Sequence, residues 1–247
     1  MTSLLNIFWL TGDWLNLNNY NRRYPSIEAK TWKWVLSFIL SIGSFFLVSL
    51  IFELLGSKNE ILIALLISAL CLVALWVVDR QFIFKIFLPL KMKDILYILL
   101  GLGFSFVAVI LASIAMAQMG IQGSENPIFD ILNDDNIKRF IVSTMIQFIA
   151  EEIIFIIPFL FVINKLRTKN EKLKTLAAIL VSSLIFGAMH LTTYNFNILQ
   201  AVLVISIIRT GLTMSYVLSK NLTVTYLVHM IYDWTLIWIY LTAGKMA

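Results

Sequence analysis

Seven long apolar stretches alternate with short polar segments along the chain. Each stretch is long enough to cross a hydrocarbon core as an α-helix, which takes about 20 residues. The stretches cover residues 32–55, 60–79, 94–119, 139–164, 174–194, 197–219 and 222–243. Because no Pro/Gly-rich linker or internal repeat interrupts this pattern, it predicts one all-α, polytopic transmembrane bundle of about seven crossings.

The composition agrees with a membrane protein. Of 247 residues, 60% are hydrophobic and only 13% are charged, which no ordinary soluble domain could expose to water. Cys71 is the single cysteine, so an intramolecular disulfide is excluded. The expected environment is therefore membrane lipid, and no nucleic-acid partner is expected.

The basic residues are distributed unequally between the two sets of predicted loops. Fourteen of the 19 Lys and Arg residues fall on one side, in segments 22–33, 80–93 and 165–174 and at Lys220. Cytoplasmic loops carry such an excess, so a cytoplasmic N-terminus and an external C-terminus are predicted, in the plasma membrane.

The first 31 residues differ from the rest. An apolar run at 4–10 precedes polar residues 16–23, which is typical of a segment lying along the membrane interface, with a disordered tail as the alternative. We therefore predict an N-terminal interfacial segment, 1–31, and a transmembrane domain, 32–247.

Ionisable residues inside the apolar stretches are the candidates for chemistry, because such groups are costly in hydrocarbon. Glu151 and Glu152 lie in the fourth stretch, where two adjacent carboxylates repel each other and favour retention of a proton. Successive helix residues point about 100° apart, so the two glutamates are expected to play different parts. The alternative is that a neighbouring helix neutralises both without catalysis.

Two histidines accompany the glutamates, and they are the only histidines in the chain. His190 follows Phe186 by one turn in the fifth stretch, and His229 precedes Asp233 by one turn in the seventh. A carboxylate at this spacing can orient an imidazole, although such a pair can also merely satisfy itself. Together the acidic and imidazole groups indicate one buried hydrolytic site.

These motifs resemble the CAAX protease and bacteriocin-processing family, also called Abi. Its pattern is Glu-Glu-x-x-x-Arg, then Phe-x-x-x-His, then His-x-x-x-Asn or Asp. The matches are Glu151-Glu152, Phe186 to His190, and His229 to Asp233, in the same order and within about 139 to 240. The resemblance implies an intramembrane endopeptidase whose substrate is a membrane-associated peptide or membrane protein, with a membrane protein partner as a further option. The candidate roles are maturation of a bacteriocin or pheromone peptide and bacteriocin self-immunity.

One position departs from the family pattern, because Ile156 stands where the family has its arginine. Arg209 lies about twelve residues into the sixth stretch from the outer side, the same depth as Glu151 in the fourth. We expect Arg209 to supply the missing charge, with Glu152 as the candidate partner; the alternative is a lone arginine lining a cytoplasmic-facing cavity. The depths of His190 and His229 differ by roughly 13 Å on the same count, which tilt or a kink must close.

The resemblance implies that Glu151 and His190 polarise a water molecule, while His229, oriented by Asp233, stabilises the oxyanion. No cofactor is expected; a zinc-dependent version would use His190, His229 and Glu151 or Asp233 as ligands. Two other classes remain open. One is a catalytically inactive relative that binds and regulates a partner or confers immunity, and the other is a proton-coupled transporter.

Overall fold

The computed structural model describes residues 22–120, 126, 132 and 136–244, and every regular element among them is helical. The helices are α2 (Thr31–Leu54), α3 (Glu60–Val78), α4 (Phe82–Ile86), α5 (Met92–Gln118), α7 (Ile137–Lys165), α8 (Glu171–Met189), η1 (Leu199–Val204), α9 (Ile205–Ser219) and α10 (Leu222–Gly244). Seven helical segments in this part of the chain are long and apolar enough to cross a membrane, counting η1 and α9 as one. The all-α polytopic prediction is confirmed.

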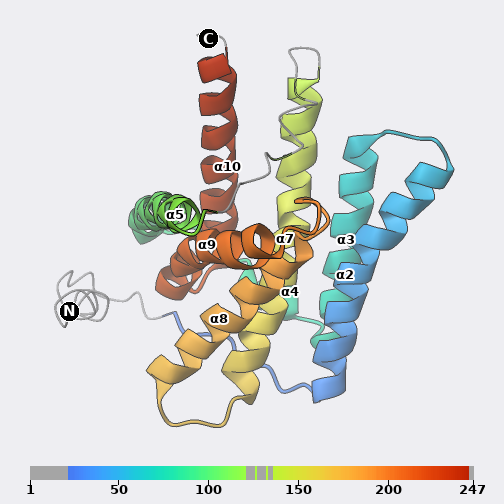
Figure 1. Cartoon of the computed structure of the whole chain (residues 1–247). Helices are drawn as coiled ribbons and strands as arrows, with labels where there is room; N and C mark the ends of the chain where they lie inside the picture. Colours follow the sequence, from blue (N-terminus) through green and yellow to red (C-terminus); the bar gives the residue numbers. More distant parts are fainter. Residues whose placement is uncertain (1–21, 121–125, 127–131, 133–135, 245–247) are drawn as a thin grey trace.

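Helix α7 lies at the centre of the bundle. Every residue from Glu152 to Leu160 is buried, so this part of the helix is covered on all sides by its neighbours. The pair α2 and α3 packs on one side of α7, and α8 packs on another. In Figure 1, α7 and α10 stand upright, whereas α9 lies across them and α5 is seen nearly along its axis.

Close approach between α5 and α9 depends on glycine. A Cβ added to Gly211 of α9 would lie 2.8 Å from the carbonyl oxygen of Phe104 and 2.8 Å from the Cα of Ser105. On α5, a Cβ at Gly101 would lie 2.7 Å from the Cβ of Ser215. Small residues let helix backbones come together in this way, and here they hold α9 in place beside α5.

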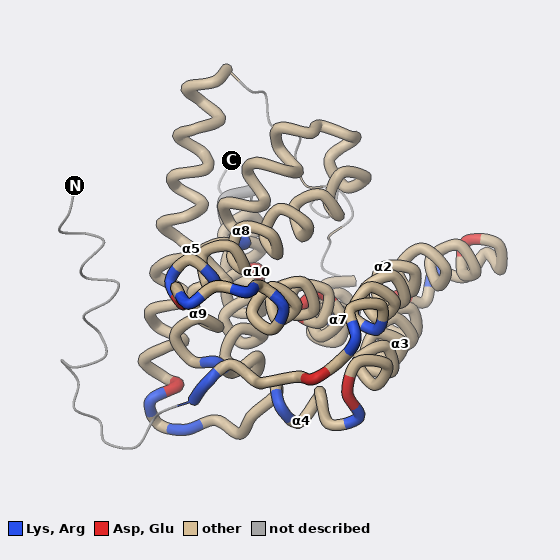
Figure 2. Tube along the Cα trace, turned by 90° about the horizontal axis from the view of Figure 1, so that it is seen from below, with Lys and Arg blue, Asp and Glu red and all other residues tan. Residues whose placement is uncertain are grey.

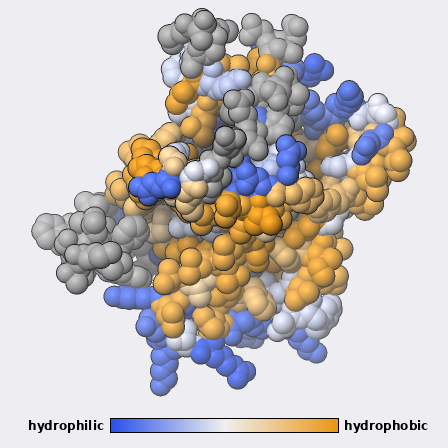
Figure 3. Space-filling view, in the orientation of Figure 1, coloured by the Kyte–Doolittle hydropathy of each residue, from blue (hydrophilic) through white to orange (hydrophobic). Residues whose placement is uncertain are grey.

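One end of the bundle gathers the basic segments, and we call it the basic end. It comprises residues 22–33, 79–93, 165–174 and 220–221. Long-range hydrogen bonds join these segments: Arg22 to Asp94, Lys165 to the carbonyl of Ala29, and Asn221 to the backbone of Leu88. Figure 2 looks at the bundle from this side, and Figure 3 shows hydrophilic residues below an apolar belt. The basic residues predicted to lie on one side of the membrane are therefore gathered at one end of the folded bundle.

The structure shifts the predicted bounds of the fifth stretch. Helix α8 begins at Glu171, where the Asn170 side chain accepts a hydrogen bond from the Leu173 amide at 3.1 Å, and it ends at Met189 rather than 194. The predicted interfacial segment falls mostly on residues 1–21, which lie outside the described residues. Residues 22–30 form no regular element and run along the basic end.

Candidate active site

The two glutamates of α7 face different surroundings. Glu152 is completely buried, and its carboxylate accepts two hydrogen bonds from Arg209, Nη1 to Oε1 at 2.7 Å and Nη2 to Oε2 at 2.8 Å. Glu151 is partly exposed and lines a cavity. The separation follows from the rotation of about 100° between successive helix residues. One carboxylate is enclosed in an ion pair, and the other faces the cavity.

Arg209 is as buried as the carboxylate it binds. Its guanidinium carbon lies 3.8 Å from the ring centroid of Phe155 and 4.7 Å from that of Phe186. Aromatic faces attract a guanidinium, and a bidentate carboxylate neutralises it. The expected contact between Arg209 and Glu152 is present, so a cation from α9 neutralises the carboxylate, which the uncharged Ile156 cannot do.

His229 connects the glutamate pair to Asp233. Its Nδ1 lies 2.7 Å from Oε1 of Glu152, and its Nε2 lies 3.4 Å from Oδ2 of Asp233 and 3.8 Å from Oε2 of Glu151. Phe148 stacks on the imidazole, with ring centroids 4.5 Å apart. Contacts at both nitrogens and on one face fix the orientation of the ring.

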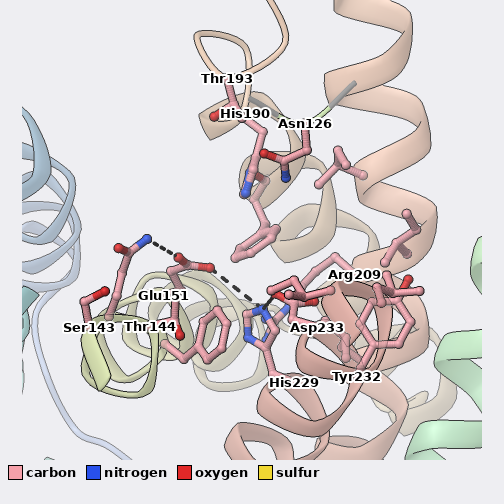
Figure 4. A pocket seen from close by; sticks show the side chains of 18 of the residues that line it. Asn126, Ser143, Thr144, Glu151, His190, Thr193, Arg209, His229, Tyr232 and Asp233 are labelled. Atoms are coloured by element: carbon pink, nitrogen blue, oxygen red, sulfur yellow. Dashed lines mark hydrogen bonds and ion pairs between the residues drawn. The ribbon is translucent and has the colours of Figure 1, made fainter. Parts of the chain in front are cut away.

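The cavity has a volume of about 480 Å³ and brings the predicted residues together. Its lining includes all the candidate residues except Glu152: Glu151, Phe186, His190, Arg209, His229 and Asp233. Figure 4 shows His190 at one side of this space and Glu151, His229 and Asp233 at the other. The acidic groups and both imidazoles therefore share one pocket.

His190 holds a separate position within that pocket. It caps the C-terminus of α8, and its Nδ1 lies 2.8 Å from the carbonyl oxygen of Phe186. The Phe186 ring lies 4.8 Å from the His190 ring and 6.3 Å from the His229 ring, measured between centroids. Phe186 thus lies beside both histidines, which Figure 4 places on different sides of the pocket.

The pocket also contains residues that the sequence motifs do not single out. Nε2 of Gln147 donates a hydrogen bond of 2.7 Å to Oε1 of Glu151, one helical turn away. Tyr194 lies in the segment after α8, where burial and the charge of Asp233 raise the pKa of its phenol. A spacing of four residues before Glu151 was the available signal for Gln147; Tyr194 has no such signal.

The alternative zinc set is not assembled. Among residues 22–120, 126, 132 and 136–244, no group of three or more His, Cys, Asp and Glu side chains is placed to hold a metal ion. Nδ1 of His190 contacts the carbonyl oxygen of Phe186, and Nδ1 of His229 faces Glu152, so neither nitrogen is directed at a shared metal position. The donor geometry does not fit a preformed three-ligand zinc site.

The fold and the pocket define a multi-pass integral membrane protein with an acidic and imidazole site enclosed by its helices. Residues 134–235 match the family model for type II CAAX prenyl endopeptidase Rce1-like proteins. The matched region contains all the candidate residues, so the resemblance indicated by the three motifs is confirmed. No curated protein and no solved structure matches the chain.

Proposed function

We propose that this protein is an intramembrane endopeptidase that cleaves a membrane-associated peptide or protein segment. The observation that carries the proposal is that the two glutamates have different surroundings. Arg209 and His229 both contact the Glu152 carboxylate, whereas Glu151 faces the cavity beside the imidazole of His229. The family match, whose description names an endopeptidase, supports the same chemistry.

Glu151 acts in this proposal as the general base. A water molecule in the cavity gives a proton to the Glu151 carboxylate as its oxygen attacks the peptide carbonyl, and the same proton then passes to the leaving amine. His190 faces the cavity from the opposite side and helps to polarise the water. The water is thereby consumed at the scissile bond.

His229 stabilises the oxyanion. Both of its nitrogens face carboxylates, which are hydrogen-bond acceptors, and a doubly protonated ring is the form that donates to both. The donor at Nε2 then lies at the cavity beside Asp233 and Glu151. Asp233 is assigned to orienting the His229 ring and not to binding the oxyanion, because an ionised carboxylate would repel a second negative charge.

The proposed biological role is maturation of a membrane-associated peptide, such as a bacteriocin or pheromone precursor, or bacteriocin self-immunity by cleavage. The rival class, an inactive partner-binding regulator, was based on the loss of the motif arginine. The buried Arg209–Glu152 pair removes that reason, since the charge is supplied by another helix.

The proposal is tested by the peptides that accumulate in membranes. Cells producing wild type, His190→Ala, His229→Ala or the control Thr192→Ala at equal protein levels would be compared by mass spectrometry. Thr192 is exposed and adjoins the pocket residue Thr193. We expect new peptide termini with wild type and Thr192→Ala and their loss with both histidine variants. Identical peptides from all four would refute proteolysis, and a shared phenotype without cleaved peptide would favour the regulator.

Gln147 is proposed to position Glu151. A hydrogen bond to a charged group contributes about 1.5–3 kcal/mol, so Gln147→Leu should lower kcat roughly 10- to 100-fold. KM should change little, because Gln147 orients the base through one carboxylate oxygen. Steady-state kinetics measures both constants. A rise in KM with normal kcat would assign Gln147 to substrate binding instead.

A further inference from the structure

The cavity lies in the half of the bundle that is remote from the basic end. Helix α7 runs toward the basic end, and its lining residues are confined to the stretch from Phe140 to Glu151. Helix α10 runs away from that end, and its lining residues fall between His229 and Ile237. The two helices therefore place the pocket on the same side.

Two further helices agree with this placement. Helix α3 ends at the basic end, and it contributes Glu60 and Ile63 from its opposite, first turn. Helix α8 begins at the basic end, and it contributes Phe186 together with its C-cap residue His190. In Figure 1 the connection between α7 and α8 lies at the bottom, whereas the connection between α2 and α3 lies at the top.

A continuous aromatic stack separates the site from the basic end. Below the guanidinium of Arg209, the ring of Phe155 lies 5.6 Å from Phe159 and 6.3 Å from Tyr216, between centroids. Tyr24, in the basic end, continues the stack at 5.6 Å from Phe159 and 6.0 Å from Tyr216. Phe155, Phe159 and Tyr216 are completely buried, so the stack fills this route.

The opposite route is lined by polar groups. Glu60, Asn126 and Thr193 come from three different segments that line the cavity, and Ser143 and Thr144 line it from α7, on the N-terminal side of Glu151. Hydroxyl and amide groups can replace the hydration of a peptide backbone that enters the bilayer. A peptide can reach Glu151 along this lining without passing the aromatic stack.

We infer that the site takes its substrate from the extracytoplasmic face of the membrane. The excess of basic residues assigns the basic end to the cytoplasm, and the residues that line the cavity belong to the other half of the bundle. The inference rests on the proposed function for the chemistry, and it narrows the substrate class. The substrate is a membrane-associated peptide whose scissile segment has been exported, not a prenylated protein whose cleavage site stays in the cytoplasm.

Thiol labelling tests this sidedness without requiring proteolysis. Cys71, the single cysteine, is buried between α2 and α3, and Cys71→Ser gives a cysteine-free background. Pocket positions would be tested with Thr193→Cys and Ile237→Cys. The exposed references are Lys58→Cys, in the connection between α2 and α3, and Lys169→Cys, in the basic end. A membrane-impermeant maleimide is added to intact cells and to permeabilised cells.

We expect Thr193→Cys or Ile237→Cys to react in intact cells together with Lys58→Cys, and Lys169→Cys to react only after permeabilisation. If both pocket cysteines are unreactive in intact cells, the inference is wrong. It is equally wrong if Lys169→Cys reacts in intact cells and Lys58→Cys does not, because the chain is then inverted. If only the proposed proteolysis is wrong, the labelling pattern is as expected, but the membrane peptides are the same for wild type and the histidine variants.

Discussion

Glu151→Gln should abolish peptide cleavage while leaving the protein folded. Removal of a general base typically costs about 10²- to 10⁴-fold in rate. Glutamine has nearly the size of glutamate, and Glu151 is at the cavity wall with 15% of its side chain exposed, so packing should survive. The measurement is kcat/KM of the purified protein in lipid vesicles, with the membrane peptide identified by mass spectrometry as substrate.

Glu152→Gln is the matched comparison for that result, because it should lower stability as well as cleavage. Breaking a buried ion pair by removing one partner costs about 3–5 kcal/mol, because the other charge is left uncompensated. We expect a lower unfolding temperature in detergent for Glu152→Gln and an unchanged one for Glu151→Gln. Normal cleavage by Glu151→Gln, with loss of cleavage by a stable Glu152→Gln, would mean that the two roles are exchanged.

The sequence allowed prediction of the helices because hydrocarbon imposes a length on every crossing. Apolar runs of the required length coincide with the seven helical segments to within a few residues. Depth counting also identified the partner of Glu152, because the rise per residue is nearly constant along a helix. Arg209 and Glu152 had to lie at one level before they could form the observed bidentate pair.

Rotation of the helices about their axes could not be predicted in the same way. Spacing shows that His229 and Asp233 share a face, but it does not show which neighbour that face meets. The π-helical turn η1 adds to the difficulty, because it changes the angular position of every residue that follows it, Arg209 included. The two hydrogen bonds between the Asn221 side chain and the Leu88 backbone likewise join segments that are far apart in the chain, so spacing could not predict them.

His190 illustrates a second limit of sequence reasoning. Periodicity continued the fifth crossing to residue 194, whereas α8 ends at Met189 and the chain turns at His190. The apolar character of the stretch therefore hid the end of the helix. The result matters for function, because the turn carries His190, Thr193 and Tyr194 to the cavity from outside any crossing.

Arg209→Leu should destabilise the protein and abolish cleavage together. The variant leaves the fully buried carboxylate of Glu152 without its bidentate partner, at a cost of about 3–5 kcal/mol. It also removes the cation between the rings of Phe155 and Phe186. Arg209→Lys should be intermediate, because an ammonium keeps the charge but cannot make the planar, two-fold contact. Thermal unfolding and cleavage are measured on the same samples.

Two double variants separate charge compensation from catalysis. Glu152→Gln combined with Arg209→Met removes both charges, so it should regain stability relative to Arg209→Leu, since no buried charge is left without its partner. Cleavage should stay absent, because His229 loses the carboxylate at Nδ1 that orients it. Ile156→Arg in the Arg209→Leu background places an arginine one turn after Glu152, at the family's position, and should restore part of the stability. If Arg209→Leu alone keeps full stability and full cleavage, Arg209 does not replace the motif arginine.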